Sequence, residues 1–326
     1  MGARTNVLGV SFSALLVASS LVGCSSDSTT PVSTADCAPE NQPLCTIGQQ
    51  VISDCLALVD DSASQTPTLR MAQLILSQPL ALAGGAVQDT VINGGVTLNL
   101  PSCQMGDSLP SSTYGNFNWL MQFDLAAKKL KTGGAHPELD PLTGYTFADE
   151  MITQGGHTFH IAPVELDLTL TNNADGSIGF DVTNGLDLTV PIYQDKQAST
   201  EILLPLHAAR LTNGTLSPDH NCIGALDLAN LTPDDSCKLP DPYLTAGTLD
   251  GFITLEEADS VEITMLNTTL CAVLAGAGGT TCSRTNGKID YQGNWCEATN
   301  AAATANCSDA VQLEATFAAA AVKLNP

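Results

Sequence analysis

The chain has 326 residues, with 11 Lys and Arg against 34 Asp and Glu, so its formal net charge is −23. The scarcity of basic residues excludes nucleic-acid binding by the usual route, because phosphate neutralisation needs clustered cations. It also argues against docking on an anionic membrane surface through protein charge. With 44% hydrophobic residues the chain is no disordered acidic tail, and it is long enough to bury a sizeable core.

The first 23 residues are organised as a targeting segment. Arg4 provides a short positive region, and a mostly apolar run with small residues follows over Val7–Val22. The run ends in Leu21-Val22-Gly23-Cys24, which resembles the lipobox of bacterial lipoproteins. The resemblance implies that signal peptidase II cleaves after Gly23 and that Cys24 carries a diacylglyceryl thioether and an N-acyl chain such as palmitate. The alternative is an ordinary secretory signal with a chance cysteine.

The residues after the lipobox indicate where the protein is held. In the lipoproteins that this segment resembles, a serine in the position of Ser25 usually goes with outer-membrane sorting. Residues 25–36 are mainly Ser, Thr, Pro and Asp, which predicts a flexible tether. We therefore expect a signal peptide at 1–23, a lipidated cysteine and tether at 24–36, and a single globular β-rich domain at 37–326. The expected location is the cell envelope, as an outer-membrane lipoprotein that faces the periplasm or the surface.

The pattern beyond the tether is mostly that of strands. One short helix is expected over Thr46–Asp60, where apolar residues recur with a helical period. Asn172 to Gly176 has the composition of a hairpin turn. Alternating apolar residues predict strands in the segments Phe117–Phe123, Leu166–Leu170, Ile178–Val182, Leu186–Ile192, Ile202–Leu206 and Leu249–Ile253.

The C-terminal third is less regular. Thr254 to Glu257 fits a capping box and predicts a helical turn before a strand at Val261–Ile263. The Ala-rich segment Asn294–Asn306 is expected to be helical. Val311–Phe317 alternates like a strand, although the following alanines favour helix, and we predict a strand. The predicted fold is mainly β, an antiparallel sandwich or barrel with a short N-terminal helix and disulfide-stapled loops.

The cysteines indicate an oxidising compartment. Apart from Cys24 their number is even, and no Cys-x-x-Cys pair or His-rich knuckle supports zinc binding. Local pairing is the simplest expectation and gives Cys222–Cys237, Cys271–Cys282 and Cys296–Cys307. The ten cysteines expected to form disulfides are Cys37, Cys45, Cys55, Cys103, Cys222, Cys237, Cys271, Cys282, Cys296 and Cys307.

Two histidines lie close together in the sequence, at His157 and His160, with Glu165 nearby. On a strand, positions i and i+3 face opposite sides, so the two rings would not converge. A zinc site needs three convergent ligands. We therefore interpret both as polar loop histidines and predict no metal site.

The remaining candidate motifs have structural explanations. The Asp-Gly turn at Asn172–Gly176 lacks the glutamate of a calcium loop, and Gly276–Gly279 lacks the Lys-Ser/Thr of a phosphate loop. Lys128, Lys129 and Lys131 could contact an anion but fit a solvated strand end better. Phe117, Trp119 and Phe123 could stack on a sugar, yet they alternate with Met121 in a way that indicates core.

Three phrases of the body resemble uncharacterised, Cys-containing lipoproteins of Gram-negative bacteria, a likeness that brings no activity with it. They are Phe117-Asn118-Trp119-Leu120, Leu130-Lys131-Thr132-Gly133-Gly134 and Asn221-Cys222-Ile223-Gly224.

No Gly-x-Ser-x-Gly elbow or other catalytic constellation is present, so no catalytic residue and no cofactor are predicted. The first hypothesis is a non-catalytic, lipid-anchored envelope protein, a binding or structural module. Its expected partners are the membrane, through the acyl chains on Cys24, and a protein, glycan or lipid ligand. The alternatives are a secreted hydrolase whose site forms only in the fold and a carrier of an apolar ligand in a β-barrel.

Overall fold

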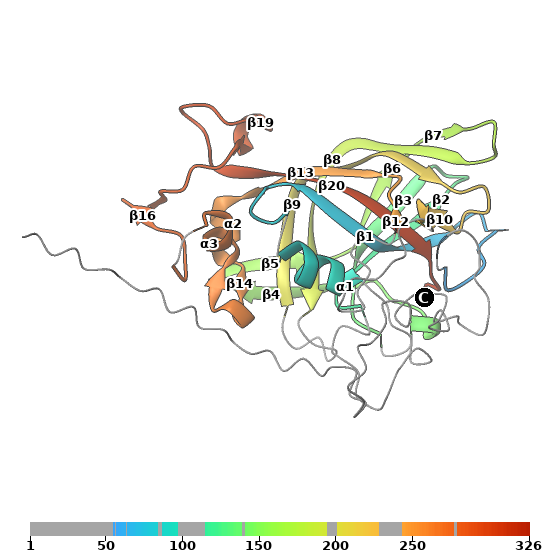
Figure 1. Cartoon of the computed structure of the whole chain (residues 1–326), viewed down its shortest axis with the longest axis horizontal. Helices are drawn as coiled ribbons and strands as arrows, with labels where there is room; N and C mark the ends of the chain where they lie inside the picture. Colours follow the sequence, from blue (N-terminus) through green and yellow to red (C-terminus); the bar gives the residue numbers. More distant parts are fainter. Residues whose placement is uncertain are drawn as a thin grey trace, which may run out of the picture. The chain divides into compact units, whose positions relative to one another are not determined.

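Alternating apolar residues build long strands, and every pairing between named strands of the described residues is antiparallel (Figure 1). The computed structural model describes residues 55, 57–62, 64–83, 87–96, 115–138, 141–193, 201–227, 243–276 and 279–326. The main sheet contains β1 (Thr68–Gln78), β2 (Asn118–Asp124), β3 (Lys129–Ala135), β6 (Val164–Asp167), β7 (Thr169–Asn172), β8 (Ile178–Tyr193), β9 (Glu201–Leu216), β10 (Cys222–Ile223), β13 (Thr248–Thr254), β18 (Trp295–Cys296), β19 (Ala301–Ala302) and β20 (Ala310–Ala321).

Short hairpins and helices complete the described part. The hairpins pair β4 (Glu150–Gln154) with β5 (His157–Ile161), β11 (Ala225–Leu226) with β12 (Tyr243–Leu244), β14 (Glu262–Ile263) with β15 (Thr268–Thr269), and β16 (Arg284–Thr285) with β17 (Lys288–Ile289). The helical segments are η3 (Val87–Asn93), α1 (Gly94–Val96), η6 (Pro141–Thr143), α2 (Leu255–Ser260), η7 (Thr264–Leu266), α3 (Leu270–Leu274) and η8 (Glu297–Thr299).

The strands β6 and β7 close the sheet into a barrel. They are consecutive along the chain and are separated only by Leu168. β6 pairs with β3, while β7 pairs with β8. Together they join the two ends of the path β3–β2–β1–β20–β13–β9–β8. The predicted fold class is confirmed, and the architecture is a closed barrel with outer strands.

Aromatic and aliphatic side chains fill the barrel. Phe117, Trp119 and Phe123 are at most 1% exposed and pack with the core, so the prediction that this stripe is core is confirmed. The rings of Phe123 and Phe180 meet edge to face, with 5.0 Å between their centroids. A Cβ atom at Gly214 would lie 2.1 Å from the Phe180 ring, so β9 approaches this ring at a distance that only glycine allows.

Two of the three predicted local disulfides are confirmed and one is wrong. Cys271 pairs with Cys282, and Cys296 pairs with Cys307. Cys222 pairs with Cys55 and not with Cys237, which lies outside the described residues, as do Cys24, Cys37, Cys45 and Cys103. The long-range bond forms because the segment before β1 hydrogen bonds to the end of β20, where Leu58 N donates to Ala321 O, and β10 pairs with that same end.

Two helix predictions need correction. Residues 46–54 lie outside the described part, but Cys55 and residues 57–60 form an irregular segment with one β-bridge, so no helix extends to Asp60. Asn294–Asn306 is not a helix, and it contains β18, the 3₁₀ turn η8 and β19. The α-helical bonding of an Ala-rich segment is replaced here by pairing with β20 and by the Cys296–Cys307 bond.

The other predicted strands are present, but Leu166–Leu170 is divided at Leu168 into β6 and β7, and the two segments predicted within 178–192 form the single strand β8. β7 and β8 form the hairpin whose turn is held by Asp175, which accepts hydrogen bonds from the Ser177 amide and hydroxyl. Val311–Phe317 lies within β20, which pairs with β1 and β13 and whose alternate residues in this segment are buried. Thr254 caps α2 by accepting from the Glu257 amide, the Glu257 carboxylate bonds back to the Thr254 hydroxyl, and the strand predicted after the helix is β14.

Candidate functional site

A cavity of about 270 Å³ lies between the barrel wall and the elements packed outside it. The wall contributes Asp187 from β8 and His207 from β9, while β5 contributes His157 and His160 and α2 contributes Glu257. No Lys or Arg is among the described residues that line the cavity. We refer to this cavity as the histidine pocket.

His207 is the centre of the pocket's polar contacts. Its Nδ1 lies 3.3 Å from an Asp187 carboxylate oxygen, and its Nε2 forms a short contact with Glu257 Oε2. The imidazole also stacks on the ring of Phe252, with centroids 5.4 Å apart. The hydrogen bond with Glu257 raises the pKa of His207, an effect that outweighs the opposing effect of burial. The protonated ring can therefore donate to both carboxylates at once.

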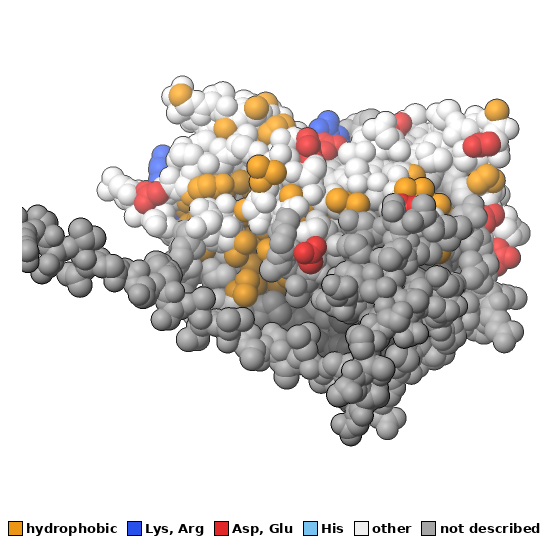
Figure 2. All heavy atoms as spheres, viewed as in Figure 1, with side chains coloured by type: hydrophobic (Ala, Val, Ile, Leu, Met, Phe, Trp, Pro, Cys, Tyr) orange, Lys and Arg blue, Asp and Glu red, His pale blue; other side chains and the backbone are white. Residues whose placement is uncertain are grey.

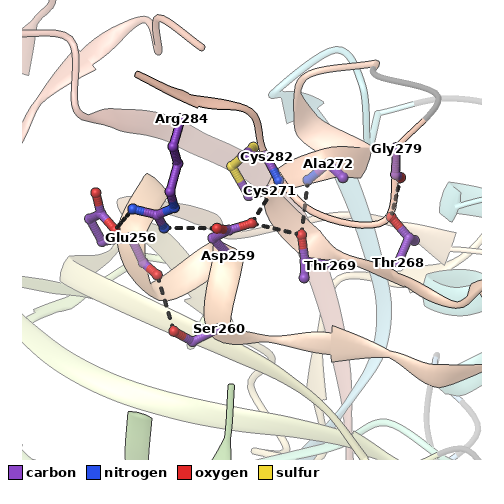
Figure 3. Close-up of a disulfide and its surroundings, with 10 residues drawn as sticks. All are labelled: Glu256, Asp259, Ser260, Thr268, Thr269, Cys271, Ala272, Gly279, Cys282 and Arg284. Carbon is purple, nitrogen blue, oxygen red and sulfur yellow. Dashed lines mark hydrogen bonds and ion pairs between the residues drawn. A yellow bond between two sulfur atoms is a disulfide. The ribbon is translucent and has the colours of Figure 1, made fainter. Parts of the chain in front are cut away.

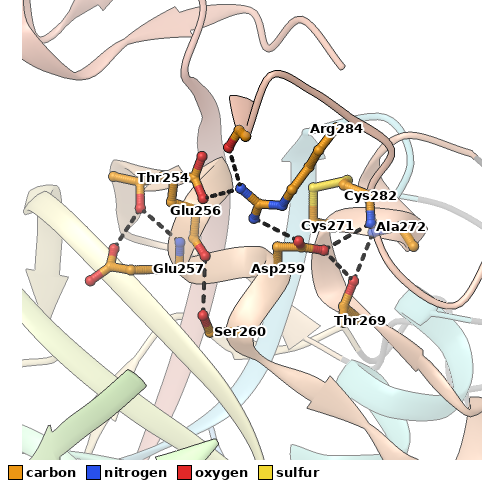
Figure 4. Close-up of polar contacts among 11 residues, drawn as sticks. Thr254, Glu256, Glu257, Asp259, Ser260, Thr269, Cys271, Ala272, Cys282 and Arg284 are labelled. Carbon is orange, nitrogen blue, oxygen red and sulfur yellow. Dashed lines mark hydrogen bonds and ion pairs between the residues drawn. A yellow bond between two sulfur atoms is a disulfide. The ribbon is translucent and has the colours of Figure 1, made fainter. Parts of the chain in front are cut away.

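Glu257 is held by the start of α2 (Figure 4). The Thr254 hydroxyl accepts a hydrogen bond from the Glu257 amide and donates one of 2.7 Å to Glu257 Oε2. Burial raises the pKa of Glu257. The hydrogen bonds from His207 and Thr254, together with the charge of His207, lower this pKa by more than burial raises it, so the net shift is downward. The capping glutamate of a short helix is therefore also the central carboxylate of the pocket.

The position of α2 depends on the next residues of the chain (Figure 3). Asp259 accepts hydrogen bonds from the Thr269 hydroxyl at 3.0 Å and the Cys282 amide at 2.8 Å. Its other oxygen binds the guanidinium of Arg284 at 2.8 Å, and Arg284 also forms an ion pair with Glu256 at 2.8 Å. Because Cys282 is bonded to Cys271 in α3, the disulfide and this network fix α2 against α3.

The two histidines singled out by the sequence have separate partners. His157 Nε2 lies 3.7 Å from Glu257 Oε1, whereas His160 Nε2 lies 3.2 Å from Asp149. Both lie in strand β5 and not in a loop, which corrects the sequence interpretation, because β4 supplies the pairing partner that makes a strand. The two rings therefore contact different carboxylates, although both residues line the histidine pocket. Glu165 takes no part in the pocket and pairs with Lys129 at 3.8 Å.

His207 and Asp187 were not indicated by any sequence motif. His207 follows the alternating residues Ile202, Leu204 and Leu206 of β9, where a polar residue marks only the outward face of a strand. Asp187 occupies the same kind of position in β8. The one available signal was a histidine inside a strongly apolar strand, and without its partners this signal has no chemical meaning.

The side chains of the pocket are better suited to binding a molecule than to attacking it as a nucleophile. The hydroxyl-bearing residues among its described lining are Thr158 and Thr189, and Thr158 bonds to Thr153. His207, on strand β9 of the barrel wall, faces carboxylates with both ring nitrogens. Two other groups bring sulfur and a carboxylate together, Asp259 with Cys271 and Cys282, and Asp309 with Cys296 and Cys307. Their sulfur atoms are in disulfides and are therefore not available as thiolate ligands.

A second cavity is apolar and small. It has a volume of about 50 Å³ and is lined by aliphatic residues such as Leu74, Leu204 and Val273. Sites for small organic ligands usually have volumes of about 300–1,000 Å³. This second cavity is therefore too small to hold a large apolar ligand.

The remaining candidates of the sequence have structural roles where they are described. Lys129 forms a 2.7 Å ion pair with Asp167, and the Lys131 ammonium lies over the Phe147 ring. Lys128 has a positive φ angle and occupies the turn before β3. The interpretation of this lysine group as a strand end is confirmed. Gly276 lies in the loop closed by the Cys271–Cys282 bond, as expected, while residues 277 and 278 lie outside the described part.

Acidic side chains are spread over the face shown in Figure 2, with Lys and Arg in only a few places.

None of the helices in the described part is long and apolar enough to cross a membrane. Comparison with protein families, curated proteins and solved structures finds no match to the chain.

Proposed function

We propose that this protein is a non-catalytic, lipid-anchored envelope protein that binds a small polar ligand in the histidine pocket. The observation that carries the proposal is the arrangement of His207, whose two ring nitrogens both face carboxylates. A ring in this arrangement is stabilised as a cation and has no free nitrogen with which to activate a nucleophile. The pocket therefore supports binding better than acid–base catalysis.

The proposed anchor rests on the sequence. The lipobox ends at Cys24, and residues 25–36 have the composition of a flexible tether that would separate the domain from the membrane. The three disulfides of the described residues fit this location, because disulfides persist in oxidising compartments such as the periplasm. The sorting signal at Ser25 supports the outer membrane as the destination.

A secreted hydrolase is the second candidate, and the pocket itself is the observation that favours it. His207, Asp187 and Glu257 are the residue types that hydrolases use for proton transfer. The hydroxyl groups of Thr158 and Thr189 line the same cavity. In a hydrolase, His207 would have to exchange one of its carboxylate contacts for a substrate or a nucleophile.

The anchor is tested by metabolic labelling with an alkynyl palmitate analogue in a bacterial host that processes lipoproteins. The wild-type protein is expected to carry the label and to sediment with membranes. Cys24→Ser should abolish labelling and release the protein from the membrane fraction, while Cys103→Ser should retain the label. Labelling that persists in Cys24→Ser would overturn the proposed anchor.

The choice between binding and hydrolysis is tested with chromogenic esters, phosphate esters and glycosides. We expect no turnover above that of a buffer control. Turnover that disappears in both His207→Gln and Asp187→Asn, while the circular dichroism spectrum is unchanged, would overturn the non-catalytic proposal and support the hydrolase.

A further inference from the structure

We infer that the histidine pocket binds a small organic cation that carries a primary ammonium group, with Glu257 as its counter-charge. This inference rests on the proposed binding function and names the class of ligand. The cavity volume of about 270 Å³ lies just below the ~300–1,000 Å³ that is usual for small-molecule sites, so the pocket suits a ligand smaller than a drug-sized compound.

The Glu257 carboxylate has one oxygen available to a ligand. Its Oε2 faces Nε2 of His207 and accepts a hydrogen bond of 2.7 Å from the Thr254 hydroxyl (Figure 4). Its Oε1 lies 3.7 Å from His157 Nε2, which is beyond hydrogen-bond distance, and no other polar partner of Oε1 is found among the described residues. Because the side chain is only 20% exposed, solvent screens a charge bound there less than at the open surface.

The charge of the pocket favours a cation. Protonated His207 offsets only one of the two carboxylates, Asp187 and Glu257, and no Lys or Arg is found among the described lining residues. One negative charge is therefore uncompensated. Asp187 contributes little of the attraction, because its side chain is 71% exposed, and Glu257 contributes most of it. Carboxylate and phosphate ligands would be repelled, whereas an ammonium group adds charge attraction to the hydrogen bond that it donates.

The geometry of the carboxylate selects an ammonium over a guanidinium. A guanidinium binds a carboxylate best as a fork, with one N–H on each oxygen. Oε2 of Glu257 is already occupied by His207 and Thr254, so a fork would have to break these contacts. An ammonium is a compact charge with three donors, and it needs Oε1 alone. A neutral imidazole accepts an N–H, so His157, which faces the same oxygen, offers a second acceptor.

A buried hydroxyl is an independent indication that the pocket holds a polar ligand. Thr189 of β8 lines the cavity and is only 9% exposed. No hydrogen bond of its hydroxyl is found among the described residues, whereas the Thr158 hydroxyl bonds to that of Thr153. Burying a hydroxyl without a partner costs free energy, so buried hydroxyls usually have one. A ligand with a second hydrogen-bonding group, such as an amino alcohol, would supply this partner.

The apolar part of the lining fits the carbon chain of such a ligand. Leu188, Pro205 and Leu206 of the barrel wall and Val164 of β6 line the same cavity. Methylene groups that leave water to contact these side chains bind favourably. The probe for the site is therefore 4-amino-1-butanol, which has an ammonium group at one end, a hydroxyl at the other and methylene groups between them.

The test is an NMR titration of the full-length, oxidised protein in detergent, with its histidines labelled with ¹³C. The chain has five histidines, so five ring Cε1–H signals are expected, each assigned from the variant that lacks it. 4-Amino-1-butanol hydrochloride at neutral pH should shift the signals of His157 and His207 until they saturate. The signals of His136 and His220, which do not line the cavity, should stay unchanged.

Two analogues of the probe test the class of ligand on the wild-type protein. 1,4-Butanediol replaces the ammonium group with a hydroxyl of similar size and removes the charge. 4-Guanidino-1-butanol keeps the charge but needs both oxygens of a carboxylate for its fork. Each should bind at least tenfold more weakly than 4-amino-1-butanol.

Variants test the residues. Glu257→Gln should weaken binding of 4-amino-1-butanol at least tenfold, and its amide oxygen can still accept from Thr254, so it is expected to fold. The matched control is Glu150→Gln, which should leave the affinity unchanged, because Glu150 pairs with His136 at 3.3 Å and neither residue lines the cavity. Thr189→Val removes the hydroxyl at nearly constant shape and should weaken binding about 2–10-fold, the equivalent of one hydrogen bond.

The comparison of probes decides the inference even if a variant fails to fold, which its circular dichroism spectrum would reveal. Equal affinity for 4-amino-1-butanol and 1,4-butanediol, or no shift of the pocket signals with the amine, would overturn the inference. So would equal affinity in folded Glu257→Gln and Glu150→Gln. Tighter binding of D-glucose than of the amine would assign the pocket to a neutral sugar and overturn the ammonium class. Failure of the proposed function would be seen separately, as hydrolytic turnover or as loss of acylation in the wild-type protein.

Discussion

The Cys55–Cys222 disulfide should stabilise the barrel more than any short disulfide loop can. It joins residues that are 167 positions apart, whereas Cys271 and Cys282 are 11 positions apart. In the chain-entropy description, cross-linking the longer loop contributes about 5 kcal/mol to the free energy of unfolding and the shorter loop about 3 kcal/mol. We therefore expect C55A/C222A to lose about 2 kcal/mol more stability than C271A/C282A.

Packing adds to the effect in the same direction. Cys55 and Cys222 are fully buried in a small cluster with Ala57, Ala320 and Ala321. Loss of the bond also removes the covalent link between the segment before β1 and the β10–β20 end of the barrel. Total stabilities of single domains are about 5–15 kcal/mol, so C55A/C222A should approach the limit of folding at 37 °C.

The assay is equilibrium denaturation of both double variants and the wild type in guanidinium chloride. The free energy of unfolding is obtained from the midpoint and the slope of the transition. Each variant lacks both cysteines of a pair, so neither leaves an unpaired partner that could form a wrong disulfide. Equal losses in the two variants, or a larger loss in C271A/C282A, would refute the reasoning from loop length.

Three further predictions concern the pocket and the barrel. The raised pKa of His207 and the lowered pKa of Glu257 mean that their pair stabilises the fold most between about pH 4.5 and 6.5. The stability lost in His207→Gln, measured by urea denaturation, should therefore shrink as the pH rises through the raised pKa, and a loss that grows with rising pH would contradict it. Gly214→Ala should cost about 1–3 kcal/mol, because the new methyl group meets the Phe180 ring, and a neutral effect on the melting transition would disprove this close approach. Thr254→Ala should cost about 1 kcal/mol through loss of the helix cap, while Thr254→Ser should restore most of the denaturation midpoint.

The strands could be predicted because alternation reports directly on burial. The residues from Phe117 to Phe123 and from Val311 to Phe317 alternate because one side of each strand faces the barrel interior. Closure of the barrel could not be predicted in the same way. It depends on a single short segment, β6 with β7, that pairs first with β3 and then with β8. Alternation specifies which residues face inward but not which strands are neighbours.

Prediction of the disulfide partners from cysteine spacing is limited in a similar way. Loop closure favours nearby cysteines, and this reasoning is correct for Cys271 with Cys282, where a short loop connects the partners. It is wrong for Cys222, because the sheet brings Cys55 to it from 167 positions away. Once the barrel has formed, the entropy of closing the long loop has already been overcome by strand pairing, so spacing no longer determines the partner.

The histidine pocket could not be predicted from the sequence for a related reason. Glu257 has a complete local explanation as a helix cap, and His207 has one as an outward-facing strand residue. Each residue satisfies a local rule, and nothing in its neighbourhood requires a second role. Only the packing of α2 against β9 brings the two side chains together.

The origin of the pocket also argues that it is functional. β8 and β9 belong to the barrel wall, but the β4–β5 hairpin and α2 lie outside the closed circuit of strands. Gln154 of β4 joins the hairpin to the wall and to β14, which follows α2, because its amide nitrogen donates to Glu201 O and its amide oxygen accepts from Glu262 N. Such a rigid addition is not needed to close the barrel, yet it is what brings His157 and Glu257 over His207. Binding sites are commonly built in this way, from elements added to a fold that is stable without them.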